Sequence, residues 1–271
     1  MLECLMEFAK RCADLGDYET SARNYELALN ISQKLCDHEL ELNNMIEMGI
    51  CVAYSYQLLP AIEIFNNAAK LAHKSGLDEQ AARSEIGLIN CYIHTMDYEN
   101  ARIHLERAGK YFDTLDISGG FNLYHQQYLY NLLHLYMLIN RTDLFFEKYE
   151  WVMEHIGPDD MGLKVRSLFQ VGDVYLQIGE NDKSRKILDE ARKIAYEMGD
   201  IRVIDFALST LSMCYKSLGD IEMSAAVTSE LIETSRDMQY LGTGHMTMAE
   251  LAHTEEEAYE HLLTALNLFS L

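Results

Sequence analysis

The feature that most constrains the fold of this sequence is a three-residue pattern, most often small–large–small, that returns at a nearly even spacing along the whole chain. In each copy the second residue follows the first by four positions and the third follows by three more, so all three lie on one helical face. The seven copies are Ser21/Tyr25/Ala28, Ala61/Phe65/Ala68, Ala101/Leu105/Ala108, Phe145/Tyr149/Val152, Ser184/Leu188/Ala191, Ser224/Thr228/Leu231 and Ala258/Leu262/Ala265. The regularity of this spacing, with a period near 40, indicates a repeat protein.

Each repeat has the pattern of two antiparallel helices joined by a tight turn, most clearly in residues 168–195. There Gly172 and Tyr175 lie in the first predicted helix, Gly179 opens the turn, and a triplet follows in the second helix. A small residue that faces a large one allows two helices to approach closely. The same marks recur: a Tyr stands nine positions before the triplet at Tyr92, Tyr136, Tyr175 and Tyr215, and a Gly stands twelve positions before it at Gly49 and Gly172.

This pattern resembles the tetratricopeptide repeat, which has a Gly and a Tyr in its first helix and a small–large–small face in its second. The period near 40 is similar to the long form of that repeat in bacterial signal-responsive regulators and eukaryotic scaffold proteins. The resemblance covers nearly the whole chain. It implies an all-α fold, a right-handed α/α superhelical solenoid of about seven helix-turn-helix repeats. We expect one domain over 1–271, with repeats at about 2–41, 42–81, 82–121, 126–164, 165–204, 205–238 and 239–271.

Two connections depart from the regular spacing. Residues 114–124 lengthen the connection before the fourth repeat and contain Gly119 and Gly120, and residues 156–162 contain Pro158. We interpret both as ordinary loops; the alternative is a flexural point between repeats one to three and repeats four to seven. Pro60 is expected in the first turn of a helix, where its missing N–H costs nothing.

The charge and cysteine content exclude several classes of protein. Asp and Glu number 43 against 22 Lys and Arg, a net charge of −21, and no local basic patch offsets it, so we expect no direct nucleic-acid binding. The acidity favours solubility; the alternative is an acidic groove that selects a basic partner. The six cysteines form no CxxC pair, which indicates a reducing compartment. Without a signal peptide or an apolar run of roughly 20 residues, a cytoplasmic protein with no membrane partner is expected.

Motifs for catalysis or metal binding are missing from the sequence. We find no P-loop, GxSxG, HExxH or GxGxxG motif. The histidine pairs His94/His104 and His253/His261 lack cysteine or carboxylate partners at zinc-site spacing. The sequence therefore predicts a protein that is not an enzyme, with no metal site and no cofactor.

The remaining candidate site is the concave face that the first helices of such a superhelix would form. Helical phase counted from the Tyr position points a set of mostly polar residues toward this face. Amides can donate to and accept from a peptide backbone, Tyr gives adaptable apolar contact, and Arg can hold a carboxylate. The alternative is that these residues are polar because they face water. The candidate peptide-binding residues are Tyr54, Arg83, Asn90, His94, Gln127, Asn131, His134, Arg166, Asp173 and Gln177.

These features lead to two hypotheses for the function. The first is a non-catalytic scaffold or sensor module that binds a peptide or protein segment in the groove. The second is a dimerisation or regulatory region of a larger bacterial signalling protein, such as a transcription regulator or a diguanylate cyclase. Its motivation is the apolar end LLTALNLFSL (262–271), because an open solenoid normally needs a polar cap. A homo-oligomer or a larger parent chain would cover that end.

Overall fold

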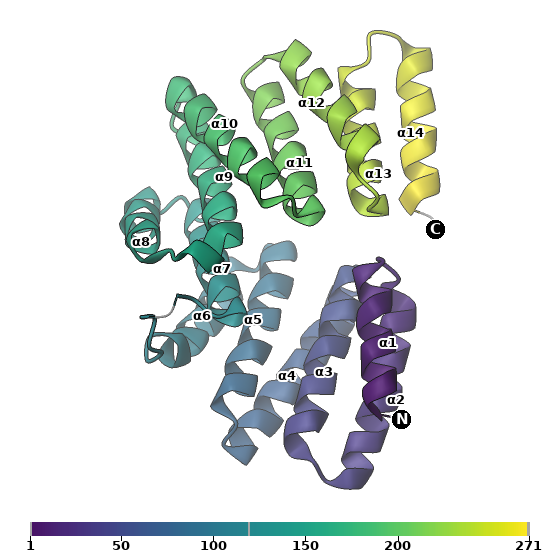
Figure 1. Ribbon diagram of the computed structural model, residues 1–271, viewed down its shortest axis with the longest axis vertical. Helices are drawn as coiled ribbons and strands as arrows, with labels where there is room; N and C mark the ends of the chain where they lie inside the picture. Colours follow the sequence, from purple (N-terminus) through teal and green to yellow (C-terminus); the bar gives the residue numbers. More distant parts are fainter. Residues whose placement is uncertain (1, 119, 270–271) are drawn as a thin grey trace. The chain divides into compact units, whose positions relative to one another are not determined.

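The structure, a computed structural model, describes residues 2–118 and 120–269, and these residues form α-helices joined by short connections (Figure 1). No β-strand occurs among them. In chain order the helices are α1 (Leu2–Asp14), α2 (Tyr18–Leu35), α3 (His38–Tyr54), α4 (Leu58–Ser75), α5 (Asp78–His94), α6 (Tyr98–Phe112), α7 (Leu123–Leu138), α8 (Thr142–His155), the short 3-10 helix η1 (Pro158–Asp160), α9 (Met161–Gln177), α10 (Asn181–Met198), α11 (Ile201–Ser217), α12 (Ile221–Thr234), α13 (Met238–Leu251) and α14 (Glu255–Phe269).

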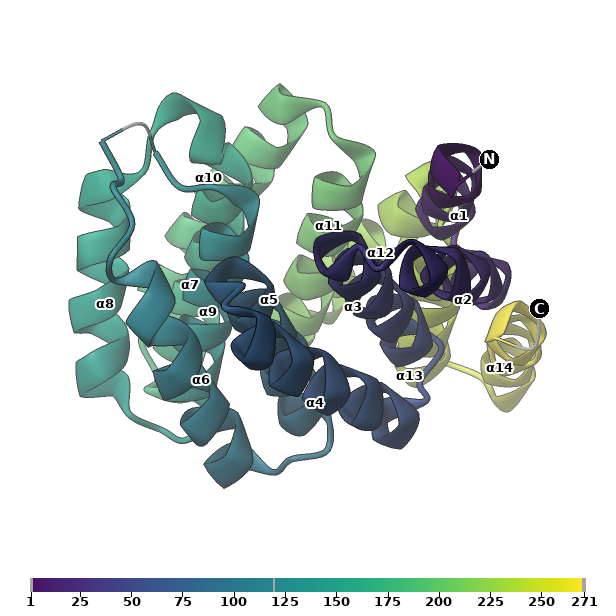
Figure 2. The ribbon, with the colours of Figure 1, turned by 90° about the horizontal axis from the view of Figure 1, so that it is seen from below.

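The chain divides into two compact units, Met1–Ile139 with α1 to α7 and Asn140–Leu271 with α8 to α14. Odd-numbered helices are called first helices here, and even-numbered helices second helices. Within the units successive first helices contact each other: α3 contacts α5, α5 contacts α7, α9 contacts α11, and α11 contacts α13. Figure 2 shows this layering in the first unit, where α2 and α4 lie on one side of α3 and α5. One face of the first helices is therefore left for other contacts.

Close helix packing in the first unit depends on Phe65 of α4. Its side chain is 1% exposed and lies between Gly49 of α3 and Gly87 of α5. A Cβ atom added to Gly87 would lie 2.4 Å from the Phe65 ring, and one added to Gly49 would lie 2.8 Å from it. Glycine at both positions lets the two first helices approach the same ring. In the second unit Gly172 of α9 lies against Leu188 of α10 in the same way, with 2.6 Å for an added Cβ.

Aspartates fix where several helices begin. Asp17, Asp37, Asp97 and Asp220 precede α2, α3, α6 and α12, and each side chain accepts a hydrogen bond from the backbone N–H three positions further on. Such a cap contributes about 1 kcal/mol. Gly76 and Gly199 end α4 and α10 in the left-handed conformation, with φ of 68° and 66°.

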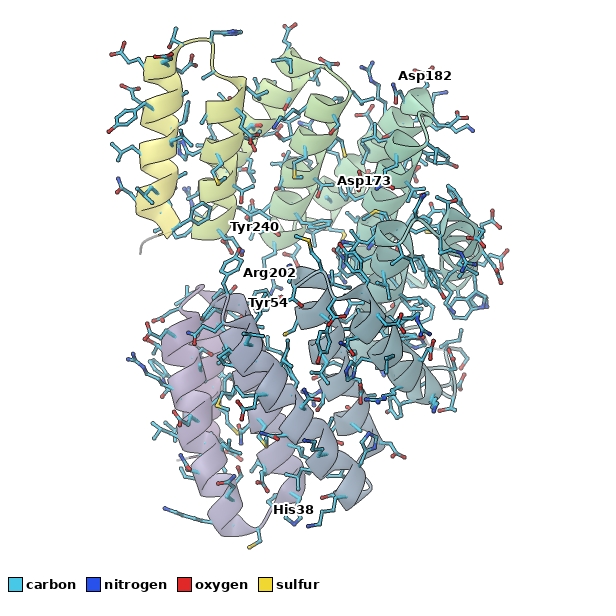
Figure 3. All side chains as sticks on the ribbon, turned by 180° about the vertical axis from the view of Figure 1, so that it is seen from behind. His38, Tyr54, Asp173, Asp182, Arg202 and Tyr240 are labelled. Carbon is cyan, nitrogen blue, oxygen red and sulfur yellow. The ribbon has the colours of Figure 1, made fainter. Side chains whose placement is uncertain are left out.

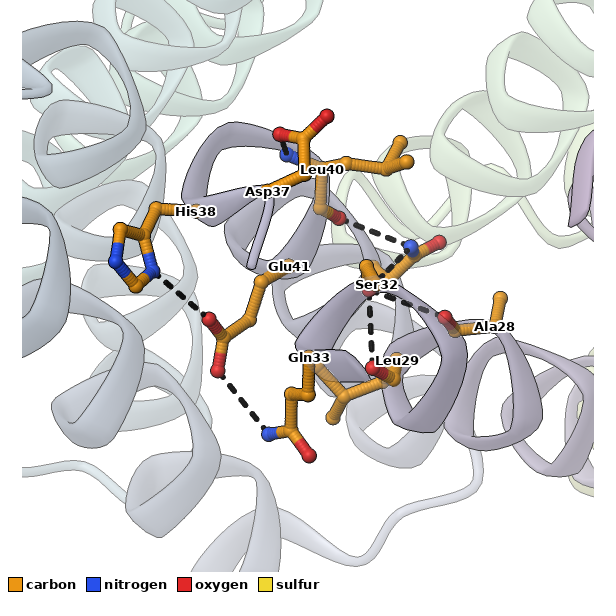
Figure 4. A network of polar contacts seen from close by, with 9 residues as sticks. Ala28, Leu29, Ser32, Gln33, Asp37, His38, Leu40 and Glu41 are labelled. Carbon is orange, nitrogen blue, oxygen red and sulfur yellow. Dashed lines mark hydrogen bonds and ion pairs between the residues drawn. The ribbon is translucent and has the colours of Figure 1, made fainter. Parts of the chain in front are cut away.

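A polar network joins α2 to α3 at their shared corner (Figure 4). The Ser32 hydroxyl donates to backbone carbonyls of its own helix and accepts from Asn44 Nδ2 at 3.4 Å. Beside it the Glu41 carboxylate accepts from Gln33 Nε2 at 3.1 Å and lies 3.2 Å from His38 Nδ1. Both helices are thereby held at the point where the chain reverses.

The predicted all-α class and the consecutive helix pairs are confirmed. From α3 on, the first helices begin slightly before the expected repeat starts, for example at His38 instead of 42, because capping residues such as Asp37 precede the apolar pattern. Pro60 lies in the first turn of α4, as expected. Gly119 lies outside the described residues. The two units divide between α7 and α8, inside the repeat expected at 126–164. The right-handed superhelix and the single continuous domain stay predictions.

The packing around Phe65 yields a stability prediction. Gly87→Ala places a methyl group where the buried ring now lies, so we expect a loss of about 1–3 kcal/mol in the free energy of unfolding. Gly162→Ala is the matched control: Gly162 is also helical, and its added Cβ meets nothing closer than 4.0 Å. This control should gain up to about 1 kcal/mol from helix propensity. Urea unfolding measures both variants, and equal midpoints would contradict the importance of the contact.

Candidate functional site

The first helices of the first unit carry seven of the candidate residues on three neighbouring helices: Tyr54 on α3, Arg83, Asn90 and His94 on α5, and Gln127, Asn131 and His134 on α7. Because α5 contacts α7 and the two run in the same direction, residues about one repeat period apart lie at the same level. The levels of the α5–α7 seam are Arg83 with Tyr124, Asn90 with Asn131, and His94 with His134.

The level nearest the start of the helices is organised by Arg83, which is 8% exposed. Its Nη1 donates to Asn43 Oδ1 at 2.7 Å, and its Nη2 donates to Glu47 Oε1 at 3.0 Å. The guanidinium carbon lies 4.2 Å from the centre of the Tyr124 ring, a cation–π contact. Arg83 therefore joins α3, α5 and α7. The carboxylate that the sequence analysis assigned to a bound partner is already supplied by Glu47.

Glu47 at this level is partly buried, and its burial affects the pKa of its carboxyl group. Desolvation raises the pKa of its carboxyl group, and the neighbouring Arg83 works against that rise. Desolvation also raises the pKa of the Tyr124 hydroxyl. The Arg83–Glu47 ion pair therefore lies where water is partly excluded. Removing one of its two side chains would leave the other charge desolvated and unpaired.

The middle level carries the amides. Asn131 is fully buried, its Oδ1 lies 3.5 Å from Gln127 Nε2, and its Nδ2 has no hydrogen-bond partner. Asn90 is partly buried and makes no side-chain hydrogen bond within the described part of the chain. A buried amide N–H without an acceptor costs about 1–3 kcal/mol. The Nδ2 group of Asn131 and the amide of Asn90 therefore remain without hydrogen-bond partners among the described residues at this level.

The last level carries aromatic rings. The pKa of His134 is lowered to about 4, first by desolvation and then by the charge of the neighbouring His94. His134 is therefore neutral at pH 7, whereas His94 is exposed. On α3, Tyr54 is exposed (Figure 3). Its ring stacks on that of Tyr18 of α2, with the ring centres 5.0 Å apart. This end of the face offers uncharged aromatic surface.

The other three candidates lie on α9 in the second unit. Arg166 is partly buried, Gln177 is exposed, and Asp173 is partly buried with no hydrogen-bond or ion-pair partner among the described residues (Figure 3). Burial raises the pKa of the Asp173 carboxyl group. The side chain lies near α11, because its charge, after burial, contributes to raising the pKa of the Cys214 thiol to about 12. A half-desolvated carboxylate of this kind attracts a cation.

Three members of the first level, Asn43, Glu47 and Tyr124, are not among the ten candidate residues. Asn43 stands one repeat period before Arg83, and this spacing is the signal that could have found it. Nothing in the spacing distinguishes Tyr124, because it follows the irregular connection. The structure does not bring together the histidine pairs His94/His104 and His253/His261. Instead, His104 forms a buried pair with Glu85, and the Nδ1 atom of His261 lies 2.9 Å from that of His245.

Residues 2–118 and 120–269 lack the features of several other kinds of site. No group of three or more His, Cys, Asp or Glu side chains in these ranges is arranged to hold a metal ion. None of the helices described there combines the length and apolar character needed to cross a membrane. All six cysteines carry free thiols.

No protein-family model and no curated protein sequence matches this chain. Its fold is nevertheless similar to several solved structures. The Rap conjugation gene regulator of the plasmid pLS20, solved in complex with the Phr* peptide, superposes with a TM-score of 0.66 at 14% sequence identity, over 98% of this chain and 73% of the regulator.

Two further structures agree with that likeness. BtubC (BKLC) from P. vanneervenii gives a TM-score of 0.61 at 20% identity, over 73% of this chain and 81% of BtubC. A tetratricopeptide repeat protein from Parabacteroides merdae gives 0.50 at 15% identity, over 98% and 99% of the two chains. These similarities show a fold of tetratricopeptide-like helical repeats, as the sequence pattern predicts.

The partly buried, neutral His134 leads to a pH prediction. Its pKa is lower in the folded chain than the ordinary value of 6.5, so its contribution to stability is complete above pH 6.5 and is lost as the pH falls toward 4. Between pH 7 and pH 5 we expect this residue to cost the wild type about 2 kcal/mol. His134→Gln should remove that part of the pH dependence in urea unfolding, whereas His73→Gln, at an exposed position on α4, should not. Identical pH dependence in both variants would contradict the assignment.

Proposed function

We propose that this chain is a non-catalytic scaffold that binds a peptide or protein segment along the face of its first helices. The observation that carries the proposal is the middle level of the α5–α7 seam. There the Nδ2 group of Asn131 has no acceptor and Asn90 makes no side-chain hydrogen bond within the described ranges. An amide side chain can donate to a backbone carbonyl and accept from a backbone N–H at the same time. An extended segment lying across α5 and α7 would meet the partly buried Asn90 amide, and the fully buried Asn131 side chain would have to turn outward to reach it.

The levels on either side give such a segment different surroundings. At one end Arg83 is held by Asn43 and Glu47, so it shapes the face and is already neutralised. At the other end, neutral His134 and exposed Tyr54 offer ring surface for apolar side chains. In the second unit Asp173 would attract a basic side chain or an amino terminus. Apolar side chains therefore suit the groups of the first unit, and a basic group suits Asp173 of the second unit, each unit being considered by itself.

The structural similarities support this proposal without extending to its residues. The Rap regulator of pLS20 was solved with a peptide bound, so a fold of this kind accommodates a peptide in that protein. A stack of helix pairs also presents its first helices side by side, which is a suitable surface for an elongated ligand. No side chain of this chain is assigned a role by that likeness.

The proposal predicts that the two amides contribute to peptide affinity and little to folding. Peptides would be selected from a displayed random library on the wild-type chain, and their dissociation constants measured by fluorescence polarisation. Asn90→Ala combined with Asn131→Ala should weaken binding roughly tenfold or more, because two amide contacts of about 1 kcal/mol each are lost. Thermal unfolding should change little, since the Asn131 Nδ2 group already lacks an acceptor.

The control is Asn66→Ala on the second helix α4. Asn66 is also partly buried, but its Nδ2 donates to the Ile62 carbonyl of its own helix at 2.9 Å. This variant should keep the wild-type affinity. Unchanged affinity in the Asn90/Asn131 double variant, with the same peptides, would rule out the α5–α7 seam as the binding face.

A further inference from the structure

Two histidine rings meet between α13 and α14 of the second unit. His245 lies on α13 and His261 on α14, and these two helices pack against each other. The Nδ1 atoms of the two rings are 2.9 Å apart, and the ring centres are 5.2 Å apart. Both side chains are partly buried. His245 and His261 are 16 positions apart in the sequence, so only the packing of the helices brings them together.

The contact between the two rings favours neutral imidazole. An Nδ1 atom can accept the hydrogen bond only if it carries no proton itself. Partial burial lowers the pKa of His245, and the charge of His261 adds to that effect. A neutral imidazole can hold its proton on Nε2 and offer the Nδ1 lone pair, which is the form that binds a metal ion. When both rings adopt this form, two ligand atoms are available at one place.

The separation of the two nitrogen atoms suits a shared metal ion. With metal–nitrogen bonds of about 2.0–2.1 Å, two ligand atoms lie about 2.9 Å apart at a right angle and about 3.4 Å apart at a tetrahedral angle. The 2.9 Å between the Nδ1 atoms of His245 and His261 lies within this range. The rings now face each other along the hydrogen bond, so each has to turn about its side-chain bonds to direct its lone pair at a common ion.

A carboxylate stands one helical turn from the pair. Glu257 precedes His261 by four positions, so both lie on the same side of α14. Glu257 is exposed, and one of its oxygens accepts from the backbone N–H of His253 at 3.2 Å. In the described ranges no three such side chains already surround one point, so Glu257 would reach the ion after a change of rotamer. Two imidazoles and a carboxylate form a suitable ligand set for Zn²⁺ and similar ions.

The charge of this part of the chain favours a cation. Residues 237–269 contain six carboxylates and no Lys or Arg. One of the six, Glu250, is paired with Lys216 of α11. The other carboxylates leave the stretch negative, which raises the local concentration of divalent cations. Charge alone would hold such ions loosely, and the two imidazoles add directed bonds to one of them.

We propose that His245 and His261 bind a divalent transition-metal ion such as Zn²⁺, with Glu257 as the third protein ligand, and that the ion fastens α14 to α13. The sequence motifs predict no metal site because they are recognised within one stretch of chain, whereas these ligands come from two helices. Nitrogen ligands favour Zn²⁺ over Mg²⁺ and Ca²⁺, which prefer oxygen. The site uses no residue of the proposed peptide-binding face, so either proposal can fail alone.

Isothermal titration calorimetry of the 271-residue chain with Zn²⁺, after treatment with a chelator, tests the proposal. The chain has 10 His and 43 acidic residues that give a background of weak sites, so the test compares variants. We expect one Zn²⁺ per chain to bind above this background. His245→Gln and His261→Gln should each weaken that site more than roughly tenfold, and Glu257→Gln should weaken it too, since each removes a ligand. His253→Gln, at an exposed position between the two helices, should keep the wild-type affinity.

Thermal unfolding with and without Zn²⁺ distinguishes metal binding from a purely structural contact between the rings. Zn²⁺ should raise the melting temperature of the wild type and of His253→Gln, because it binds the folded arrangement, and should not raise that of His245→Gln or His261→Gln. Circular dichroism confirms that the variants are folded. Zn²⁺ affinity should also fall below about pH 6, since protons compete for the imidazoles. No Zn²⁺ site above the background, or equal affinity in the wild type and the His245 and His261 variants, would overturn the proposal.

Discussion

The close approach of helices at a few small residues is the constraint on which the rest of this structure depends. Phe65 can be buried between α3 and α5 only because Gly49 and Gly87 leave room for its ring. Leu188 depends on Gly172 in the same way in the second unit. Since interiors are packed without spare volume, the size of these side chains sets how near the first helices come to each other. Their distance in turn decides which side chains can meet across the face.

Polar groups on this face differ from level to level in the hydrogen-bond partners that they have within the chain. Arg83 is almost buried, and its partners on α3 and α7 are a carboxylate, an amide and a ring. The buried amide of Asn131 is not satisfied in this way. A folded chain normally pairs its buried polar groups, so an unpaired one is a candidate for a hydrogen bond to water or to another molecule. Both terminal nitrogens of Arg83 are paired within the chain, although its Nε is not, and we therefore propose a structural role for Arg83 and a binding role for the Asn131 level.

The second helices differ in how far their apolar side is covered. Second helices inside a unit bury their apolar side under the following first helix, whereas α14 carries the same kind of side uncovered, and α1 leaves Phe8 exposed. The face of the first helices carries amides and rings, whereas α14 exposes apolar side chains such as Leu262 beside carboxylates such as Glu255.

The sequence by itself determined the helix pairs, their period and the side of each first helix that the candidate residues share. These are local properties, because a helical repeat of 3.6 residues per turn fixes which side chains lie on one face. Only the tertiary structure decided the partners across helices. Arg83 meets Asn43 and Tyr124, Phe65 meets Gly87 as well as Gly49, and the chain divides between α7 and α8. Such contacts depend on distances between helices, which follow from packing volumes that no single helix encodes.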